Sequence, residues 1–399
     1  MIKSIMLILF LGILLGKLFS KIKLPALLGM IIAGVIVGPY GLNLLDKTIM
    51  ASSGDIRKIA LIIILLRAGL GINKQLLKKV GKVSIKMSAI PCLCEGAVLL
   101  FISHKLLHLP ILQAGMLAFI IAAVSPAVVV PAMLSLKERK LGTKKGIPIV
   151  ILAGSSIDDI FAITIFTVFL GMSSNSGQSI GMQLMKIPVE IIGGILFGII
   201  SGYILEKIYN NFESRITELE KLAVLLITAF FLVVIGDLIH VSGLLSVMTL
   251  GFILLEKCEK TAKRLESQLN KIWYFAQVFL FALIGAAVNI PVAVNAGIIG
   301  IVVILIGLIG RTIGVFIALA GSNLNRKERL FCAIAYSPKA TVQAAIGAIP
   351  FQMGIPNGEL ILAISVLAII LTAPLGAIAI NSSAPKLLED NSNDEIEVA

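Results

Sequence analysis

Long apolar runs follow one another along almost the entire chain, and only short polar segments separate them. A helix that crosses a lipid bilayer needs roughly 20 mainly apolar residues. Thirteen such segments can be placed, near 4–20, 23–41, 59–73, 84–107, 110–136, 147–171, 184–205, 221–239, 241–256, 271–290, 293–321, 328–353 and 358–381. A chain with this succession of apolar segments does not fold as a soluble domain.

Composition supports the same interpretation, because 58% of the 399 residues are hydrophobic and only 14% are charged. The mean hydropathy is +1.03. Unpaired backbone groups are excluded from hydrocarbon, so a spanning segment is either a helix or part of a closed barrel. These runs lack the short alternating pattern of barrel strands. The sequence therefore predicts an all-α polytopic membrane protein with about 13 transmembrane helices.

The net charge of +12 would suit a nucleic-acid-binding protein, but the placement of the basic residues indicates a membrane protein. Alternate loops hold 25 Lys and Arg residues, whereas the other loops hold six. Cytoplasmic loops carry this excess. We therefore expect a multi-pass protein of the plasma (inner) membrane, with the N-terminus outside and the C-terminus in the cytoplasm. Its partner is the lipid bilayer, not nucleic acid. The basic segment 257–271, interpreted as an inside loop, is expected to face anionic headgroups.

Asp158 and Asp159 are adjacent in the middle of the apolar run 146–171. A carboxylate at the centre of a membrane helix costs about 2.5–3.5 kcal/mol on insertion scales, and such residues mark ion or proton pathways. Neighbouring helix positions are turned by about 100° from each other, so the two side chains point in different directions. The pair indicates a protein that exchanges protons for cations.

An internal repeat appears when the prolines inside long apolar segments are compared. Ser125 and Pro126 open the sequence SPAVVVP, and Ser337 and Pro338 open SPKATVQ, 212 residues later. Proline in a helix interior removes a hydrogen bond, so each segment should be interrupted near its middle. The loop count gives the two segments opposite directions, which is typical of inverted-repeat transporters with a site at the midplane. For either proline alone, a kinked packing helix is an equally good interpretation.

Glu95, Arg311 and Lys339 are further charged residues within predicted spans, where each needs a partner. Glu95 and Arg311 each lie in the span before an interruption, so they occupy comparable places in the two repeats. Lys339 follows the second interruption and could balance half-helix carbonyl groups or an aspartate. Because every buried charge first requires a counterion, a structural role is favoured for Lys339 over proton carriage. Arg311 stays protonated at any working pH and cannot carry the proton.

Several of these motifs together resemble the cation/proton antiporter superfamily, and within it the Na⁺/H⁺ antiporters of the double-aspartate branch. The likeness covers most of the chain. It is carried by the sequences GSSIDDI at 154–160, Ser-Pro at 125–126, GLIGRTIG around Arg311, SPKATVQ at 337–343 and FLFALIGAAVNI at 279–290. Many bacterial members have lysine at the position of Arg311. Glu95 is the expected salt-bridge partner of Arg311, as in the animal-type branch.

The resemblance implies the Na⁺/H⁺ antiporter fold, with inverted repeats and two discontinuous crossing helices. It also implies a core transport domain, with its first repeat in 84–171 and its second in 293–381, that moves against scaffold and dimerisation helices in 1–83 and scaffold and linking helices in 172–292. Members of the family are generally homodimers. Asp159 is implied as the main carrier of cation and proton, with Asp158 beside it facing a positive partner. The polar and acidic tail 382–399 is expected to be disordered and cytoplasmic.

Oxygen ligands for the cation can be sought close to the aspartates. Sodium and lithium are hard cations that prefer carboxylate, hydroxyl and carbonyl oxygens. Asp159 and Asp158 are therefore the predicted metal ligands, and Ser155 and Ser156 are candidates for additional ligands or hydrogen-bond partners. Serines that hydrogen bond to their own helix backbone are an equally weighted alternative.

The function expected from these features is exchange of Na⁺ or Li⁺ for H⁺ by alternating access, because a proton and a cation can compete for one carboxylate. Such a protein is a secondary transporter, breaks no covalent bond and needs no cofactor. The alternatives are a K⁺/H⁺ antiporter or K⁺ efflux system, and an intramembrane aspartyl protease. The protease needs its carboxylates on different helices, and the sequence contains no G-x-G-D motif.

Overall fold

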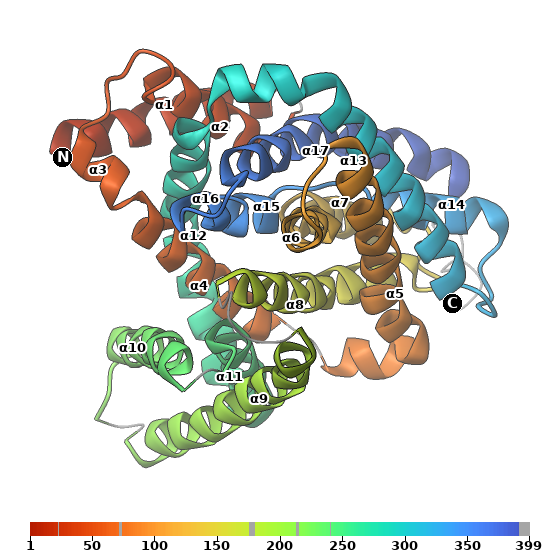
Figure 1. Cartoon of the computed structure of the whole chain (residues 1–399). Helices are drawn as coiled ribbons and strands as arrows, with labels where there is room; N and C mark the ends of the chain where they lie inside the picture. The colour runs from red at the N-terminus through yellow and green to blue at the C-terminus, as the bar shows by residue number, and fades with distance from the viewer. Residues whose placement is uncertain (23, 72–73, 175–179, 213–214, 240, 391–399) are drawn as a thin grey trace. The chain divides into compact units, whose positions relative to one another are not determined.

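The computed structural model describes residues 1–22, 24–71, 74–174, 180–212, 215–239 and 241–390, and omits the side chains at some positions within these ranges. In this part of the chain, regular structure is helical apart from one isolated bridge between Leu141 and Asp390 (Figure 1). The prediction of an all-α protein is confirmed.

The helices fall into two compact units. Unit 1 comprises Met1–Ala51, Gln75–Ser173 and Phe281–Ala399, and unit 2 comprises Ser52–Lys74 and Ser174–Leu280. Unit 1 holds most or all of α1 (Ile2–Lys21), α2 (Ala26–Val37), α3 (Lys47–Ala51), α5 (Lys74–Leu106), α6 (Ile111–Ala122), α7 (Pro126–Glu138), α8 (Ile147–Ser174), α13 (Ile290–Ala318), α14 (Arg326–Ala335), α15 (Thr341–Ile346), α16 (Ile349–Gln352) and α17 (Gly358–Leu387). Unit 2 holds α4 (Ser53–Gly71), α9 (Ile180–Asn211), α10 (Glu218–Leu238) and α11 (Gly243–Lys257), and α12 (Glu259–Ala287) passes from unit 2 into unit 1.

Each of the thirteen predicted spans corresponds to helical structure, and two of them are divided. The run 110–136 becomes α6 and α7, and the run 328–353 becomes α14, α15 and α16. Within the described residues, eight helices are long and apolar enough to cross a membrane, and two shorter apolar helices accompany them. The number of thirteen spans remains a prediction.

Two sequence-based expectations are wrong. The basic segment 257–271 was expected to be a loop, but α12 begins at Glu259. Its residues are mainly Lys, Arg, Glu, Gln and Leu, which favour helix, and Glu259 pairs with Lys263 one turn later. Residues 382–387 were expected to be disordered, but they form the last turns of α17. Residues 391–399 of the expected tail lie outside the described part of the chain.

In both segments the helix is interrupted at the Ser-Pro pair, over residues 123–125 in the first and 337–340 in the second. Pro126 occupies the first turn of α7, where a missing backbone N–H breaks no helical bond. Pro338 lies in the non-helical stretch 337–340 between α14 and α15. The backbone N–H of Ser125 donates to the carbonyl oxygen of Pro338 at 2.8 Å. This bond joins the interruption in the first repeat directly to the interruption in the second.

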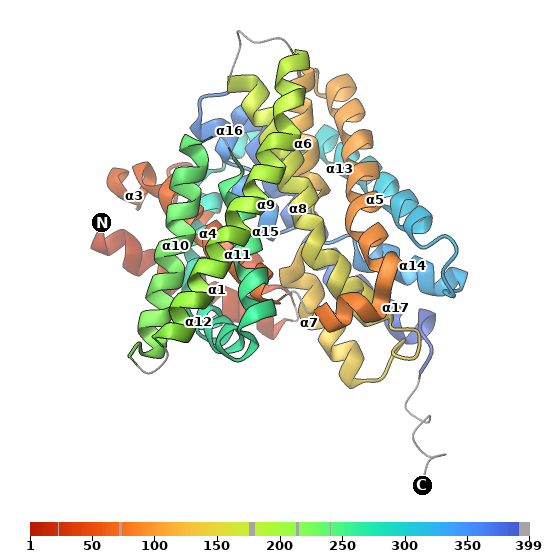
Figure 2. The ribbon, with the colours of Figure 1, turned by 90° about the horizontal axis from the view of Figure 1, so that it is seen from below.

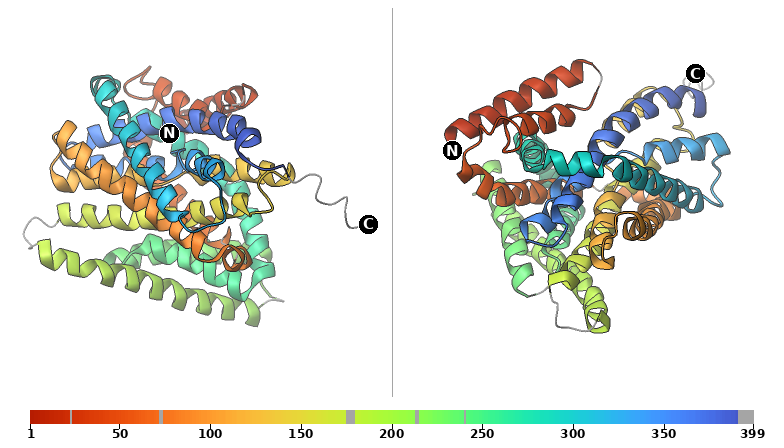
Figure 3. Two further views of the ribbon diagram at one scale, coloured as in Figure 1. Left: turned by 90° about the vertical axis from the view of Figure 1, so that its right-hand side faces the viewer. Right: turned by 45° about the horizontal axis from the view of Figure 1, so that its top comes forward.

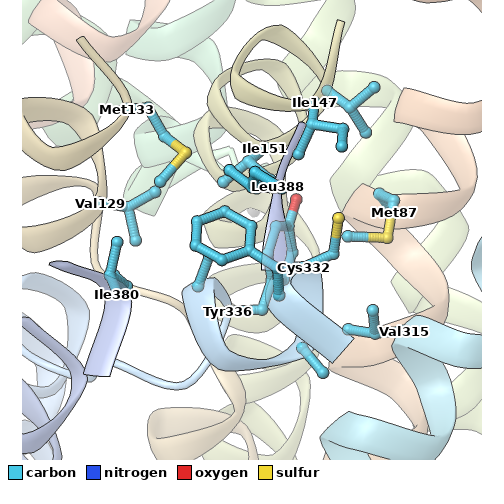
Figure 4. Packing of buried hydrophobic residues seen from close by; sticks show 14 of the residues in the cluster. Met87, Val129, Met133, Ile147, Ile151, Val315, Cys332, Tyr336, Ile380 and Leu388 are labelled. Carbon is cyan, nitrogen blue, oxygen red and sulfur yellow. The ribbon is translucent and has the colours of Figure 1, made fainter. Parts of the chain in front are cut away.

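Helix α17 is central to unit 1. It packs against α6 and α7 of the first interrupted segment and against α14, α15 and α16 of the second, and it also packs along α13 (Figure 3). A cluster of buried apolar side chains from α5, α7, α8, α13, α14 and α17 fills the space beside the interruptions (Figure 4). Met87, Met133, Ile151, Tyr336 and Ile380 are among its members. Close-packed apolar side chains therefore support the interrupted backbone.

Helix α11 has the corresponding role in unit 2, where it packs against α4, α9 and α10 (Figure 2). Small residues permit the close approach of α4 and α11. A Cβ atom added to Gly69 would collide with the carbonyl oxygen of Met248, and one added to Gly251 would lie 2.7 Å from the carbonyl oxygen of Leu66. The two backbones are therefore in contact at this pair of glycines.

We predict that Gly69→Ala lowers the stability of the protein by about 1–3 kcal/mol, because the added methyl group forces the two backbones apart. Gly297→Ala is the matched control, since Gly297 lies within α13 with open space around it. Alanine favours helix over glycine by about 1 kcal/mol, so the control should be neutral or stabilising. Apparent melting temperatures of the purified variants measure the difference. Equal melting temperatures would contradict the backbone contact.

Candidate functional site

Five charged side chains converge inside unit 1, close to the two interruptions. Glu95 comes from α5, Asp158 and Asp159 from α8, Arg311 from α13, and Lys339 from the stretch between α14 and α15. None of them is more than 7% exposed. Charges at such depth require partners, and the arrangement of those partners defines the site.

One carboxylate oxygen of Glu95 pairs with two positively charged side chains. Its Oε2 accepts a hydrogen bond from Nε of Arg311 and another, at 2.6 Å, from Nζ of Lys339. The expected partner Arg311 is therefore in place. Lys339 contacts this glutamate, which sequence reasoning had not named as its partner. Both cations are thereby fixed to α5, on the residue that lies in the span before the first interruption.

Asp158 is attached to the interrupted backbone of the first repeat. Its Oδ2 accepts a hydrogen bond from the backbone N–H of Val124 at 2.8 Å and one from Nη2 of Arg311 at 3.4 Å. Val124 lies between α6 and α7, where the backbone has no helical partner. Asp158 therefore satisfies a backbone donor of the non-helical stretch and faces Arg311 at the same time.

Asp159 has no such partners. Within the described residues it forms no ion pair, and its Oδ1 has no hydrogen-bond partner. The side chain is 7% exposed, whereas that of Asp158 is fully buried. The two adjacent aspartates thus differ: Asp158 is paired with Arg311, and Asp159 forms no ion pair with the described residues.

The two serines give different outcomes. Oγ of Ser155 donates to the carbonyl oxygen of Leu152 at 3.2 Å, which is the backbone-bonded alternative considered above. The side chain of Ser156 lies outside the described part of the structure.

The interrupted backbone is satisfied by neighbouring elements. The N–H of Lys339 donates to Oγ1 of Thr372 on α17 at 2.8 Å, and Oγ of Ser337 donates to the carbonyl oxygen of Ile334 at 2.8 Å. Oγ of Ser125 is buried without a hydrogen-bond partner in the described residues. Non-helical backbone at membrane depth is tolerated where protein groups take the place of water, and these contacts do so.

Sequence reasoning missed three side chains that shape the site. The guanidinium of Arg311 lies 5.8 Å from the ring centre of Tyr336, whose hydroxyl would collide with a Cβ atom on Gly154. Gln343 and Thr372 bind backbone groups near the interruptions. Gln343 is a polar residue in an apolar run and belongs to a motif already noted, so its position carried a signal. Tyr336 and Thr372 are single uncharged residues within apolar runs and carried none.

We predict that Glu95→Ala destabilises the protein by about 3–5 kcal/mol, because it leaves two buried cations without their shared carboxylate. Glu389→Ala is the matched control. Glu389 pairs with Lys145 at 2.9 Å, and its side chain is 50% exposed. Exposed pairs contribute at most about 1 kcal/mol. Thermal unfolding of both variants in detergent checks the difference, and a small, equal effect of the two substitutions would argue against the buried pairing.

Comparisons with known proteins give the family. Residues 5–382 match the family described as "Sodium/hydrogen exchanger, transmembrane". Sodium/hydrogen exchanger 9B2 of Xenopus tropicalis is 33% identical over 98% of this chain and 75% of that protein, and the Homo sapiens protein of the same name is 31% identical over 96% and 75%. The structure of the sodium proton antiporter MjNhaP1 from Methanocaldococcus jannaschii at pH 8 superposes with a TM-score of 0.82 at 24% identity, over 97% of this chain and 98% of that one, and shows the same fold. The chain therefore belongs to the transmembrane sodium/hydrogen exchanger family.

Proposed function

We propose that this protein exchanges Na⁺ or Li⁺ for protons across the membrane by alternating access. The observation that carries the proposal is the unequal pairing of the buried charges. Arg311 and Lys339 are held by Glu95 and Asp158, and Asp159 is the carboxylate that lacks a cationic partner among the described residues. Membership of the sodium/hydrogen exchanger family supports the same activity.

The count of charges explains how exchange arises. Three carboxylates and two cations leave one negative charge when all five groups are ionised. An unbalanced charge in a low-dielectric site is strongly unfavourable, so the site takes up either one proton or one monovalent cation. Asp159 can bind one or the other. Competition for this carboxylate couples the outward movement of cations to the inward movement of protons.

The cationic residues take no part in proton transport in this scheme. Arg311 remains protonated throughout. Lys339 is bound to Glu95 at 2.6 Å and serves as a fixed counterion, together with Arg311. One site that binds one proton or one monovalent cation predicts one-for-one exchange, which moves no net charge across the membrane.

Buried oxygen atoms beside the first interruption are available as ligands for an alkali cation. Na⁺ and Li⁺ require several oxygen ligands. In addition to Asp159, the buried Oδ1 of Asp158 and Oγ of Ser125 have no hydrogen-bond partner in the described residues and are free to serve as ligands. The cation is a substrate here, not a resident metal.

The wider assembly is also a proposal. The core segments 84–171 and 293–381 are proposed to move against the segments 1–83 and 172–292, and the protein is proposed to form a homodimer. The excess of Lys and Arg in alternate loops supports a cytoplasmic C-terminus and an external N-terminus in the plasma membrane.

We predict that Asp159→Asn abolishes exchange, because asparagine does not bind the proton and has no negative charge to balance the cation. The protein is reconstituted in liposomes that contain a pH-sensitive dye, and NaCl, LiCl or KCl is added in turn. Asp237→Asn is the control, since Asp237 is an exposed carboxylate that pairs with Lys58. Retained Na⁺-dependent proton movement in Asp159→Asn would refute the assignment. A response to KCl alone would favour the K⁺/H⁺ alternative.

We further predict that the rate of exchange is independent of membrane potential, because a one-for-one exchange transfers no net charge. Initial rates are measured in the same liposomes while a potassium gradient and valinomycin set the potential at zero or at negative inside values. In this assay the added cation enters and protons leave, so a slowing by a negative interior would show that more than one proton leaves for each cation, and would contradict the role given to Lys339.

A further inference from the structure

Gln343 ties the second repeat to the end of a helix in the first. Its side chain is fully buried on α15. Nε2 donates hydrogen bonds to the carbonyl oxygens of Ile120 and Ala123 at 2.9 and 3.0 Å, with a longer contact of 3.3 Å to Ile121. Helix α6 ends at Ala122, so its last carbonyl groups have no partner within the helix. The amide of Gln343 supplies that partner from a position more than 200 residues away.

One of these bonds reaches the site through a single peptide group. The carbonyl oxygen of Ala123 and the backbone N–H of Val124 belong to the same planar peptide unit. Gln343 donates to the oxygen of this unit, and the nitrogen of the unit donates to Oδ2 of Asp158 at 2.8 Å. Hydrogen bonds in such a chain polarise and strengthen one another in a low-dielectric interior. The peptide plane is therefore held from both sides.

We propose that Gln343 is a positioning residue for the cation site. It holds the peptide between Ala123 and Val124 in the orientation that presents the N–H to Asp158, and so fixes the residue adjacent to the carrier Asp159. This role rests on the proposed function. Gln343 itself does not touch Asp158; it acts through the peptide.

Loss of the Gln343 amide is expected to change the orientation of the peptide between Ala123 and Val124, and not the charge of the site. Replacing glutamine by methionine exchanges one uncharged side chain for another of similar length, so the balance between Glu95, Asp158, Arg311 and Lys339 is unchanged. The peptide 123–124 is then free to turn, and Asp158 loses a donor that Arg311 alone does not replace. The cation should bind more weakly, while the number of active molecules stays the same.

The experiment compares Gln343→Met with Gln113→Met. Gln113 lies on the first turn of the same helix α6, is 8% exposed, and accepts a hydrogen bond from Nδ2 of Asn357 at 2.9 Å. Gln343→Met removes the side-chain contacts with the carbonyl oxygens of Ile120, Ile121 and Ala123, and Gln113→Met removes one hydrogen bond of α6, but only Gln343→Met affects the peptide 123–124. Initial rates of exchange in liposomes are measured against NaCl and LiCl concentration at one fixed pH.

We expect Gln343→Met to raise the apparent KM for both cations by about fivefold, the size associated with losing one hydrogen bond, with Vmax per folded protein changed by less than about twofold. Gln113→Met should keep the KM of the unsubstituted protein within about twofold. A merely structural role would lower the yield or the melting temperature of both variants and leave KM unchanged. An unchanged KM in Gln343→Met, or an equal rise in both variants, would overturn the proposal.

Two additions keep the test decisive. If Gln343→Met does not reach the membrane, Gln343→Asn is tested in its place. Asparagine retains the amide on a side chain one methylene shorter, so this variant should also raise KM. Stabilisation by LiCl in detergent is the second measurement, and it should weaken in the Gln343 variants but not in Gln113→Met. Failure of the unsubstituted protein to move protons would refute the proposed function instead, and the LiCl measurement would still judge the positioning role.

Discussion

The bond between Glu95 and its two cations is the interaction on which the rest of the site depends. One carboxylate oxygen, with no exposure to solvent, receives both Arg311 and Lys339. Without it, two positive charges would stand a short distance apart in a medium that screens them poorly. With it, Arg311 can extend its Nη2 to Asp158 while its Nε stays with Glu95. Glu95 therefore holds Lys339 and Arg311, and the guanidinium of Arg311 is shared between Glu95 and Asp158.

The interruptions in the two helices are stabilised by reciprocal exchange between the repeats. In the first repeat, the backbone N–H of Ser125 donates to the carbonyl oxygen of Pro338. In the second repeat, the side-chain amide of Gln343 donates to carbonyl oxygens at the end of α6. Helix α17 supplies the hydroxyl of Thr372, and α8 supplies Asp158. Each broken helix would expose unsatisfied backbone groups if it stood alone. Together they form a junction in which each repeat satisfies backbone groups of the other, and the apolar cluster around Tyr336 lies beside it.

Much of this arrangement could be predicted from the sequence, because its physical causes are local. Apolar run length gave the helices, and proline inside such runs gave the interruptions. The depth of Glu95, Asp158 and Arg311 marked them as functional. What could not be predicted depends on three-dimensional placement. Lys339 had several acceptors within reach of its long side chain, and only the fold selects Glu95. The backbone donor at Val124 has no side-chain signature at all. The helical start of α12 escapes prediction because a cluster of charges between apolar runs is typical of a loop, although Lys, Arg and Glu also favour helix.

The bond from Ser125 to Pro338 has a consequence for how the two halves of the chain can diverge. Both partners are main-chain atoms, so the join depends on the course of the backbone and not on the identity of the neighbouring side chains. Only proline at position 125 would abolish it, for want of an N–H. The sequences SPAVVVP and SPKATVQ, which share little beyond their opening pair, illustrate the freedom that this allows. The two halves can therefore differ in their side chains, with Lys339 and Gln343 present in only one of them, while the same backbone bond joins them.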